Sequence, residues 1–258
     1  MTPALEISDL ERSFGALHVT RHVSMALFPG ARHALIGPNG AGKTTLVNLI
    51  TGALRPDRGH ILAGGEEVTA LSEPARVKKG LARTFQITEL FRELTTLENV
   101  ALSVAERRGR GWRFLGRQSS ESETIDETMG LLESLGLADD ALTPVHHLPY
   151  GRQRLVEVAV TLGQRPRVLL LDEPAAGVPS TESHLILDVL ASLPEEIAIL
   201  IIEHDMDVVF SFARSVTVLV DGAILTEGTP DEIARDPEVR TVYLGETGGR
   251  ERTVYADT

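Results

Sequence analysis

The chain has 258 residues, 42% of them hydrophobic and 24% charged, which is enough for one large domain with a substantial core. Its 37 acidic and 25 basic residues give a net charge of −12, which argues against binding nucleic acid or anionic lipid through bulk electrostatics. The sequence has no cysteine, which excludes disulfides, thiolate metal ligands and cysteine nucleophiles. Residues 1–6 lack the basic start and apolar core of a secretory leader, and the longest aliphatic run, 197–202, is far shorter than the ~20 residues of a membrane span. We therefore expect a soluble, cytoplasmic, globular protein.

The first 52 residues predict strands followed by one helix. Short apolar runs separated by turns occupy residues 4–30 and indicate a few antiparallel strands. Residues 32–36 form a short apolar strand that runs into a glycine-rich turn. Residues 46–50 then keep one helical face apolar until Gly52 ends the pattern.

The remainder of the chain alternates helices with buried strands. Residues 88–162 carry apolar side chains at helical spacings, which indicates a mainly helical insert. After this insert we expect a strand, a helix, a second strand and a hairpin around Asp221–Gly222, over residues 168–171, 183–192, 197–202 and 216–225. Buried strands that alternate with helices predict an α/β protein, with a parallel sheet covered by helices. The last dozen residues are polar and are expected to fray.

The strongest motif begins where the predicted strand 32–36 ends. It fits the pattern G-x-x-x-x-G-K-[ST] of a phosphate-binding loop, and its residues are Gly37, Pro38, Asn39, Gly40, Ala41, Gly42, Lys43, Thr44 and Thr45. Glycines allow backbone N–H groups to curl around a phosphate, and the following helix N-terminus adds partial positive charge. Lys43 is expected to reach the β- and γ-phosphates of a bound nucleotide, and Thr44 to offer its hydroxyl to Mg²⁺. The alternative is a chance glycine-rich turn, which the flanking strand and helix disfavour.

Two carboxylates follow the predicted strand 168–171. Because parallel strands end at the edge of the sheet where the phosphate loop also lies, Asp172 is expected to hold the Mg²⁺ shell. Glu173 is placed to accept a proton from an attacking water as a general base. The alternative, an acidic residue that merely begins a loop, is disfavoured by the phosphate loop upstream. His204 follows the strand 197–202; alone it would be a capping or surface residue, but here it is predicted to hydrogen-bond the γ-phosphate and the attacking water.

In their order and spacing, these motifs resemble the ATP-binding subunit of ABC transporters over nearly the whole chain. The resemblance implies one ABC ATPase domain, residues 1–258, with a P-loop NTPase core that includes a parallel sheet and a small N-terminal antiparallel β subdomain. The implied parts are a nucleotide-binding core, a helical insert subdomain with the signature motif, and a C-terminal tail, at residues 1–87 with 163–236, 88–162 and 237–258.

Three further segments match this family. Phe14 lies where the family stacks an aromatic ring on adenine, a core phenylalanine being the alternative. Gln86 resembles the family's glutamine loop, a residue that touches Mg²⁺ and water and links the core to the helical subdomain. Residues 148–153 occupy the place of the signature motif, whose helix N-terminus faces the γ-phosphate bound to a second subunit. The signature residues expected at the nucleotide are Pro149, Tyr150 and Gly151.

The chain departs from the family pattern at two places. The usual signature reads Leu-Ser-Gly-Gly-Gln, but Pro149 replaces the serine and Tyr150 the first glycine. Pro149 offers neither a hydroxyl nor an N–H, which leaves Gly151 and the following backbone to meet the phosphate. Pro179 stands where the family has an aspartate that bridges the two subunits. The slow-subunit alternative follows from these departures: a structural or regulatory subunit that binds ATP and turns over little.

Several segments look like the branched-chain amino acid importers, at residues 148–151, 172–177, 203–206, 227–233 and 243–246. The signature tyrosine is similar to that of one of the two ATP-binding subunits in this branch. The resemblance implies an ATP-hydrolysing motor that uses ATP and Mg²⁺ and is held by permease subunits at the cytoplasmic face of the inner membrane. It also implies a second ATP-binding subunit, a paralogue in preference to another copy, and indirectly a periplasmic binding protein. Relatives in this branch serve urea, amides and aromatic acids, so the sequence does not name the cargo.

Residues 107–117 run against the acidic composition, with five arginines and the only tryptophan. A flexible loop of the helical insert is one interpretation, and contact with lipid headgroups or the permease is the other. A nucleic-acid interface is disfavoured because one basic loop does not offset the net charge. A soluble ABC-type ATPase of DNA repair or ribosomes is also disfavoured: repair members separate their motifs with a long coiled coil, and ribosomal members carry two such domains.

Overall fold

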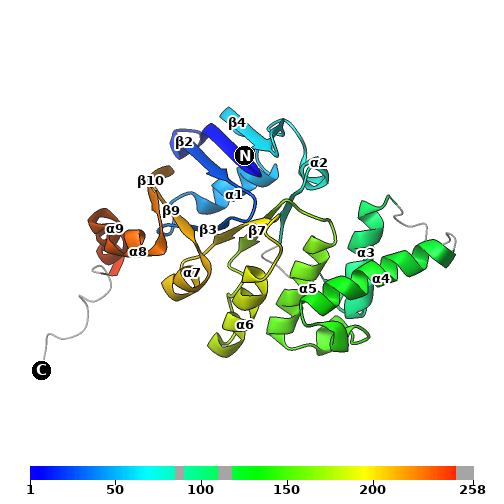
Figure 1. Ribbon diagram of the computed structural model, residues 1–258. Coiled ribbons are helices and arrows are strands. Elements are labelled where there is room, and N and C mark those ends of the chain that lie inside the picture. The colour runs from blue at the N-terminus through cyan, green and yellow to red at the C-terminus, as the bar shows by residue number, and fades with distance from the viewer. Residues whose placement is uncertain (85–89, 110–117, 248–258) are drawn as a thin grey trace, which may run out of the picture.

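A six-stranded sheet forms the centre of the computed structural model, which describes residues 1–84, 90–109 and 118–247 (Figure 1). Its strand order is β10-β9-β3-β8-β7-β6, and all of its pairs are parallel except β9 with β10. The strands are β3 (Arg32–Ile36), β6 (Leu81–Arg83), β7 (Val168–Asp172), β8 (Ala198–Ile202), β9 (Ser215–Val220) and β10 (Ala223–Gly228). The structure thus confirms the α/β class and the strands that the apolar runs predict.

A second, antiparallel sheet covers one face of the first, with the order β2-β1-β4-β5. Its strands are β1 (Leu5–Phe14), β2 (Leu17–Leu27), β4 (Arg58–Ala63) and β5 (Glu66–Glu67). Helix α1 (Lys43–Thr51) lies between the two sheets, and Leu46, Val47, Leu49 and Ile50 are all fully buried there. Strands near the N-terminus are therefore confirmed as antiparallel, and the apolar face of the first helix is its core face.

Neighbouring residues of each central strand face two different cores. In β7, Val168 and Leu170 pack against α1 and the antiparallel sheet, whereas Leu169 and Leu171 pack against the helices on the opposite face. Those helices are α5 (Tyr150–Leu162), α6 (Ser180–Ala191) and α7 (Met206–Phe212). Burial on both faces explains why these strands read as continuous apolar runs without alternation.

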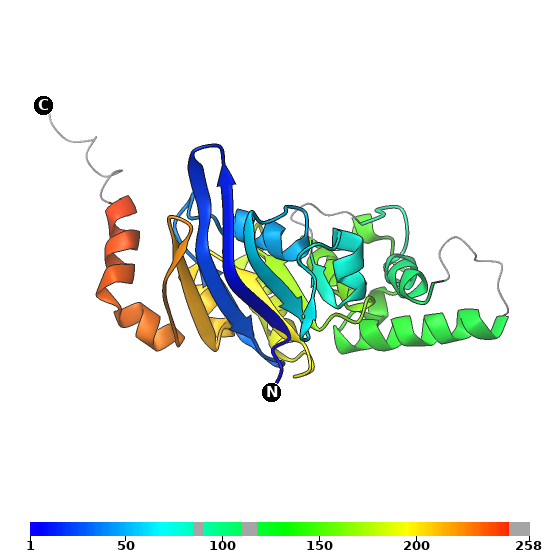
Figure 2. The same cartoon turned by 90° about the horizontal axis from the view of Figure 1, so that it is seen from above.

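A helical arm extends from one end of the central sheet, and the C-terminal helices lie at the opposite end (Figure 2). The arm contains α3 (Thr96–Arg107) and α4 (Gln118–Ser134), both packed against α5, with two short 3₁₀ turns at Ala138–Asp140 and Val145–His147. Helix α3 begins with a capping box, in which Thr95 and Glu98 satisfy each other's backbone N–H groups. A short helix, α2 (Glu73–Lys78), precedes β6 on the core side of the arm.

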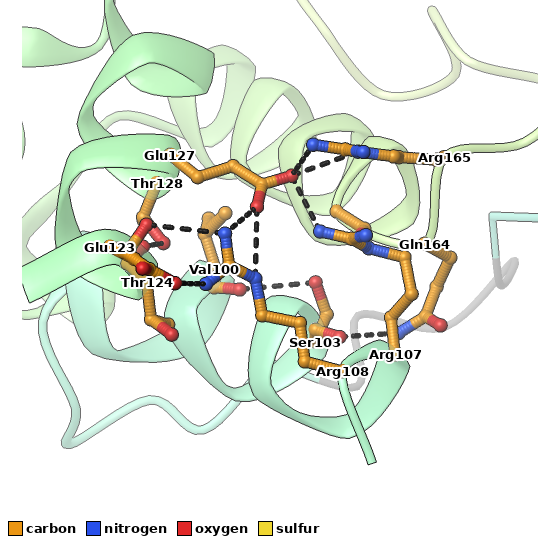
Figure 3. Close-up of polar contacts among 11 residues, drawn as sticks. Val100, Ser103, Arg107, Arg108, Glu123, Thr124, Glu127, Thr128, Gln164 and Arg165 are labelled. Atoms are coloured by element: carbon orange, nitrogen blue, oxygen red, sulfur yellow. Dashed lines mark hydrogen bonds and ion pairs between the residues drawn. The ribbon is translucent and has the colours of Figure 1, made fainter. Parts of the chain in front are cut away.

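Three arginines converge on one carboxylate where the arm meets the core (Figure 3). Glu127 of α4 accepts from Arg107 at 2.5 Å, Arg108 at 2.6 Å and Arg165 at 2.8 Å. Arg107 also donates to the carbonyl of Gly163 at 2.8 Å, so the cluster joins α3, α4 and the end of α5. The first two residues of the arginine-rich segment are therefore bound within the protein. Residues 110–117 lie outside the described part of the chain.

The C-terminal part begins with the predicted hairpin between β9 and β10. Its turn residues Asp221 and Gly222 have φ values of 47° and 80°, the positive pair that a tight two-residue hairpin needs. Two helices follow, α8 (Pro230–Arg235) and α9 (Pro237–Thr247), so part of the segment expected as a tail is helical. Residues 248–258, where fraying is expected, lie outside the described residues. Among the helices that the structure describes, none combines the length and apolarity needed to cross a membrane.

Candidate active site at the carboxyl edge of the central sheet

The predicted phosphate loop connects β3 to α1 and is shaped by close backbone contacts. Gly37 lies against the carbonyl of Leu219, and any Cβ there would overlap that oxygen. Gly42 has φ 99°, and a Cβ there would lie 2.5 Å from the carbonyl oxygen of Val19. Glycine is therefore required for the loop to pass between β2 and β9. Gly42 caps α1 without a side-chain hydrogen bond, so no capping side chain occupies the helix N-terminus, whose partial positive charge suits a phosphate.

Lys43 folds back along the loop. Its Nζ donates to the carbonyl of Gly37 at 2.5 Å and to that of Pro38 at 2.9 Å, which places a positive charge at the mouth of the loop. Thr44 is exposed at the first turn of α1, where its hydroxyl can meet a metal ion beside a phosphate. These side chains and the glycine-rich loop fit a nucleoside triphosphate with its divalent ion, as the motif predicts.

The expected acidic pair lies at the end of β7. Asp172 is buried at the last position of the strand and forms an ion pair with Arg83 of β6 at 2.6 Å. Glu173 follows with φ 48°, a left-handed conformation that is costly for a residue with a side chain. Its N–H donates to the carbonyl of Ile202 at 3.0 Å, which holds the strained residue on the end of β8. Strain of this kind is typical of a residue whose side chain must point in one fixed direction.

Glu173 meets His204 across the ends of β7 and β8. The carboxylate lies 3.2 Å from His204 Nδ1, and the two side chains are 35% and 64% exposed. The pair therefore faces solvent at the same sheet edge as the phosphate loop, because β3, β7 and β8 are parallel neighbours. A carboxylate that can accept a proton, next to an imidazole, is an arrangement that can activate a water molecule for attack.

A third ionisable group, Glu203, lies behind this pair and was given no role by the sequence interpretation. The residue is 3% exposed, and one carboxylate oxygen is buried with no hydrogen-bond partner among the described residues. The other oxygen accepts from the N–H of His204 at 3.3 Å. Burial, together with the nearby charge of Glu173, raises the pKa of Glu203 to about 7. In the sequence, the only sign of a role for Glu203 is its position next to the expected histidine. Its burial, which only the structure shows, makes it distinctive.

The two departures from the family pattern lie beside each other in space. Tyr150 begins α5, and its ring lies 3.5 Å from the Cβ position of Gly177, in the loop that leads to Pro179. Gly151 lies against the carboxylate of Glu182, and a Cβ there would overlap it. A carboxylate beside the first turn of a helix adds negative charge there, which disfavours a second anion such as a phosphate. The signature and the loop after Glu173 are thus packed together within one chain.

Phe14 ends β1 and is 46% exposed, with the guanidinium of Arg12 4.9 Å from its ring centroid. The alternative of a core phenylalanine is therefore wrong. Phe14 pairs with Leu17, and two residues further on the carbonyl of Val19 touches the phosphate loop. An exposed ring at this position is available to stack on a base. Gln86, the remaining predicted contact, lies outside the described residues.

The fold and this sheet edge define a P-loop ATPase with a helical arm inserted between its two nucleotide motifs. The family model described as ABC transporter matches residues 20–176. The model described as branched-chain amino acid ATP-binding cassette transporter matches residues 223–248. The chain belongs to the ABC transporter family and is an ATP-binding ABC ATPase subunit of the branch to which this second model refers.

Curated relatives and solved structures agree with this assignment. The chain is 39% identical over 253 residues to the high-affinity branched-chain amino acid transport ATP-binding protein BraF of Pseudomonas aeruginosa, covering 95% of this chain and 98% of that one. It is 36% identical to LivG of Escherichia coli, a protein with the same description, at the same coverage. The ADP conformation of MJ1267, an ATP-binding cassette of an ABC transporter, has a TM-score of 0.83 and 28% identity, covering 95% of this chain and 100% of that chain.

Proposed function

We propose that this chain is the ATP-hydrolysing subunit of a membrane importer for branched-chain amino acids or related small organic solutes. The observation that carries the proposal is the joint presence of Lys43, Asp172, Glu173 and His204 at one sheet edge. The similarity to BraF and LivG supports the cargo class, because both are described as branched-chain amino acid transport proteins. ATPase subunits of this family do not bind the cargo, so the exact solute depends on the partners.

The chemistry follows from positioning and charge. The loop N–H groups and Lys43 hold the phosphates, while Phe14 stacks on the adenine. Thr44 and Asp172 would hold a magnesium ion, with Gln86 as the third expected contact, and the ion would neutralise charge on the β- and γ-phosphates. Glu173 accepts a proton from the water that attacks the γ-phosphorus. His204 hydrogen-bonds the γ-phosphate and orients that water.

The proposed working unit is a pair of ATP-binding subunits. Each nucleotide would lie between the phosphate loop of one chain and the signature of the other, Pro149, Tyr150 and Gly151 in this chain. The branch supports a paralogue as the partner over a second copy. Closure and reopening of the pair would then drive the permease at the cytoplasmic face of the membrane.

A groove between core and arm is the proposed docking place for the permease. It has a volume of about 820 Å³ and separates α2 and β6 from α3 and α5. Its apolar side chains include Val77, Leu81 and Val160, and its charged lining residues are Glu73, Lys78, Arg83, Glu106 and Arg107. Such a groove suits a short amphipathic helix of a membrane subunit.

A slow subunit is the second candidate, and a specific contact favours it. Glu182 lies against Gly151, so the start of α5 carries a carboxylate where a phosphate is expected to approach. Pro149 adds no donor there, which weakens the site that this chain completes for its partner. A subunit of this kind would bind ATP and contribute little turnover to the pair.

Co-expression tests both candidates. The neighbouring genes are read first. The chain is then produced with any permeases and second ATPase that they encode, purified, and placed in lipid vesicles with a secreted binding protein. ATP-dependent uptake of leucine, isoleucine or valine supports the importer, and uptake that is lost with Lys43→Ala in this chain assigns the motor role. Unchanged uptake in that variant would favour the slow subunit. A gene that stands alone or beside repair or ribosome factors would contradict the transporter proposal.

A further inference from the structure

Arg83 of β6 connects the two elements that are expected to hold the metal ion. One end nitrogen of its guanidinium lies 2.6 Å from Asp172 Oδ2 on β7, and the other lies 2.8 Å from Asn48 Oδ1 on α1. The Arg83 and Asp172 side chains are 14% and 7% exposed, so their ion pair is poorly screened by water. The planar fork of an arginine reaches two acceptors in fixed directions, which a lysine does not.

The contact with Asn48 connects Arg83 to helix α1, which carries Thr44. Asn48 follows Thr44 by four residues on α1, so the two side chains lie on the same face of the helix. Arg83 therefore bridges the Thr44 face of the phosphate-loop helix and the carboxylate of Asp172. Arg83 donates to Oδ2 of Asp172. The direction of the second carboxylate oxygen, Oδ1, is fixed by the same hydrogen bond.

The acceptors of Arg83 distinguish it from the arginines that bind the backbone of the core. Its described hydrogen bonds go to two side chains, Asn48 and Asp172. Arg76, in contrast, is fully buried and donates from all three guanidinium nitrogens to backbone carbonyls. Arg83 therefore fixes the direction of two side chains, one of which is the expected metal ligand Asp172.

Arg83 also lines the groove between core and arm. The same side chain thus borders the proposed permease surface on one side and contacts the metal ligand on the other. Thr51, at the end of α1, lines this groove as well. A segment docked in the groove would contact the residue that holds Asp172 without touching the nucleotide.

We propose that Arg83 is a positioning residue that sets the spacing of the magnesium ligands Thr44 and Asp172, with Asn48 as its anchor. The inference rests on the proposed function, since it concerns the affinity of that ATPase site for divalent metal. Residues that orient a metal ligand typically change metal affinity by 10- to 100-fold when removed.

The test measures metal binding without turnover. The purified chain is saturated with ADP, and Mn²⁺ is titrated by electron paramagnetic resonance for wild type, Arg83→Met, Arg83→Lys, Asn48→Ala and the double variant Arg83→Met/Asn48→Ala. ADP affinity in EDTA and the thermal unfolding midpoint are measured for each. The matched control is Arg154→Met, because Arg154 forms a similarly buried ion pair, at 2.9 Å with Glu157, away from the metal ligands.

We expect Arg83→Met and Asn48→Ala each to weaken Mn²⁺ binding about 10-fold while ADP affinity in EDTA stays within about twofold. The double variant should be no weaker than Arg83→Met, because both changes break the same bridge. Arg83→Lys should recover only part of the loss, and Arg154→Met should bind Mn²⁺ as wild type does. Asn48→Ala keeps the test valid if Arg83→Met does not fold.

Unchanged or tighter Mn²⁺ binding in Arg83→Met would overturn the inference and leave the proposed function standing. Tighter binding would mean that Arg83 competes with the metal for Asp172. Additive losses in the double variant would also overturn it, because Asn48 and Arg83 would then act separately. A wild-type chain that binds ADP but no Mn²⁺ would overturn the proposed ATPase site and this inference with it.

Discussion

The carboxyl edge of the central sheet and the start of α5 both meet nucleotide in the proposed pair, but they differ in construction. At the sheet edge, Lys43, Asp172 and His204 stand on parallel strands and on a glycine loop closed by backbone contacts. At the start of α5, Pro149 and Tyr150 replace the polar and glycine positions of the family. In the proposed pair, this chain would therefore bring a well-formed half-site for its own nucleotide and a reduced half-site for its partner's. This difference separates two roles, a motor and a support for a motor, that similarity alone does not distinguish.

The largest expected effect breaks the complete half-site. Glu173→Gln removes the proposed base but keeps the size of the side chain, so ATP hydrolysis at this chain's loop should fall by about 100-fold or more while nucleotide binding persists. Phosphate release by the purified complex and binding of a fluorescent ATP analogue measure the two quantities. Glu196→Gln, an exposed residue away from the site, is the control. Hydrolysis that is unaffected by Glu173→Gln would place the turnover on the partner's loop.

The second expected effect concerns the buried acid behind the pair. Folding raises the pKa of Glu203 from 4.5 to about 7, so between these values the folded chain keeps a proton that the unfolded chain has released. The free energy of unfolding should therefore fall as the pH rises from about 4.5 to about 7, by on the order of 2 kcal/mol. Glu203→Gln should remove this contribution and be the more stable form at pH 8. The other ionisable groups that line the same pocket are His184, His204, Asp205 and Asp207, and Glu173 adds a nearby charge. The substitution leaves all of them in place.

Chemical unfolding of wild type and Glu203→Gln at pH 5, 6, 7 and 8 measures this contribution. Glu196→Gln is again the control and should follow the wild-type curve. Parallel curves for wild type and Glu203→Gln would mean that Glu203 is already ionised in the folded chain. The result sharpens the comparison, because the buried acid on α5, Glu157, is instead ion-paired at 2.9 Å with Arg154, whose guanidinium lies over the Tyr150 ring.

The smallest expected effect repairs the reduced half-site. Pro149→Ser returns a hydroxyl and an N–H at the start of α5, and Pro149 already has the extended backbone, φ −55° and ψ 152°, that a serine cap adopts. Hydrolysis at the partner's loop should rise about threefold. It is measured as phosphate release in the Glu173→Gln background, where this chain's own loop is silent. No rise would mean that Glu182 and Tyr150, rather than the missing donors, limit the signature.

Sequence patterns predicted much of the fold, because buried segments are visible in the sequence as runs of apolar residues. The strands β3, β7 and β8 read as continuous apolar runs, since each is covered on both faces. The hairpin at Asp221–Gly222 was predictable because few residues adopt positive φ at both turn positions. Helix α9 was not expected from the polar end of the chain, where the apolar pattern is weak.

The candidate site was predictable wherever the chemistry demands particular residue types at a fixed spacing. Lys43 and Thr44 belong to one short loop, so their neighbours along the chain identify them. Arg83, Asn48 and Glu203 were missed as functional candidates, because their significance depends on contacts with residues far away in the sequence. The contact of Tyr150 with Gly177 likewise joins two departures that the sequence presents separately.

By itself, the sequence determined the class of this protein: a phosphate loop, an acidic pair after a buried strand and a histidine after the next, in the order of the ABC ATPases. Local patterns suffice for this, because backbone conformation and side-chain chemistry within a few residues specify each motif. Only the tertiary structure decided which side chains hold those motifs in register. Strands β6 and β7 and helix α1 had to come together before Arg83 could bridge Asn48 and Asp172, and before burial could raise the pKa of Glu203. Distances between remote segments, and the exclusion of water that follows from them, exist only in the folded chain.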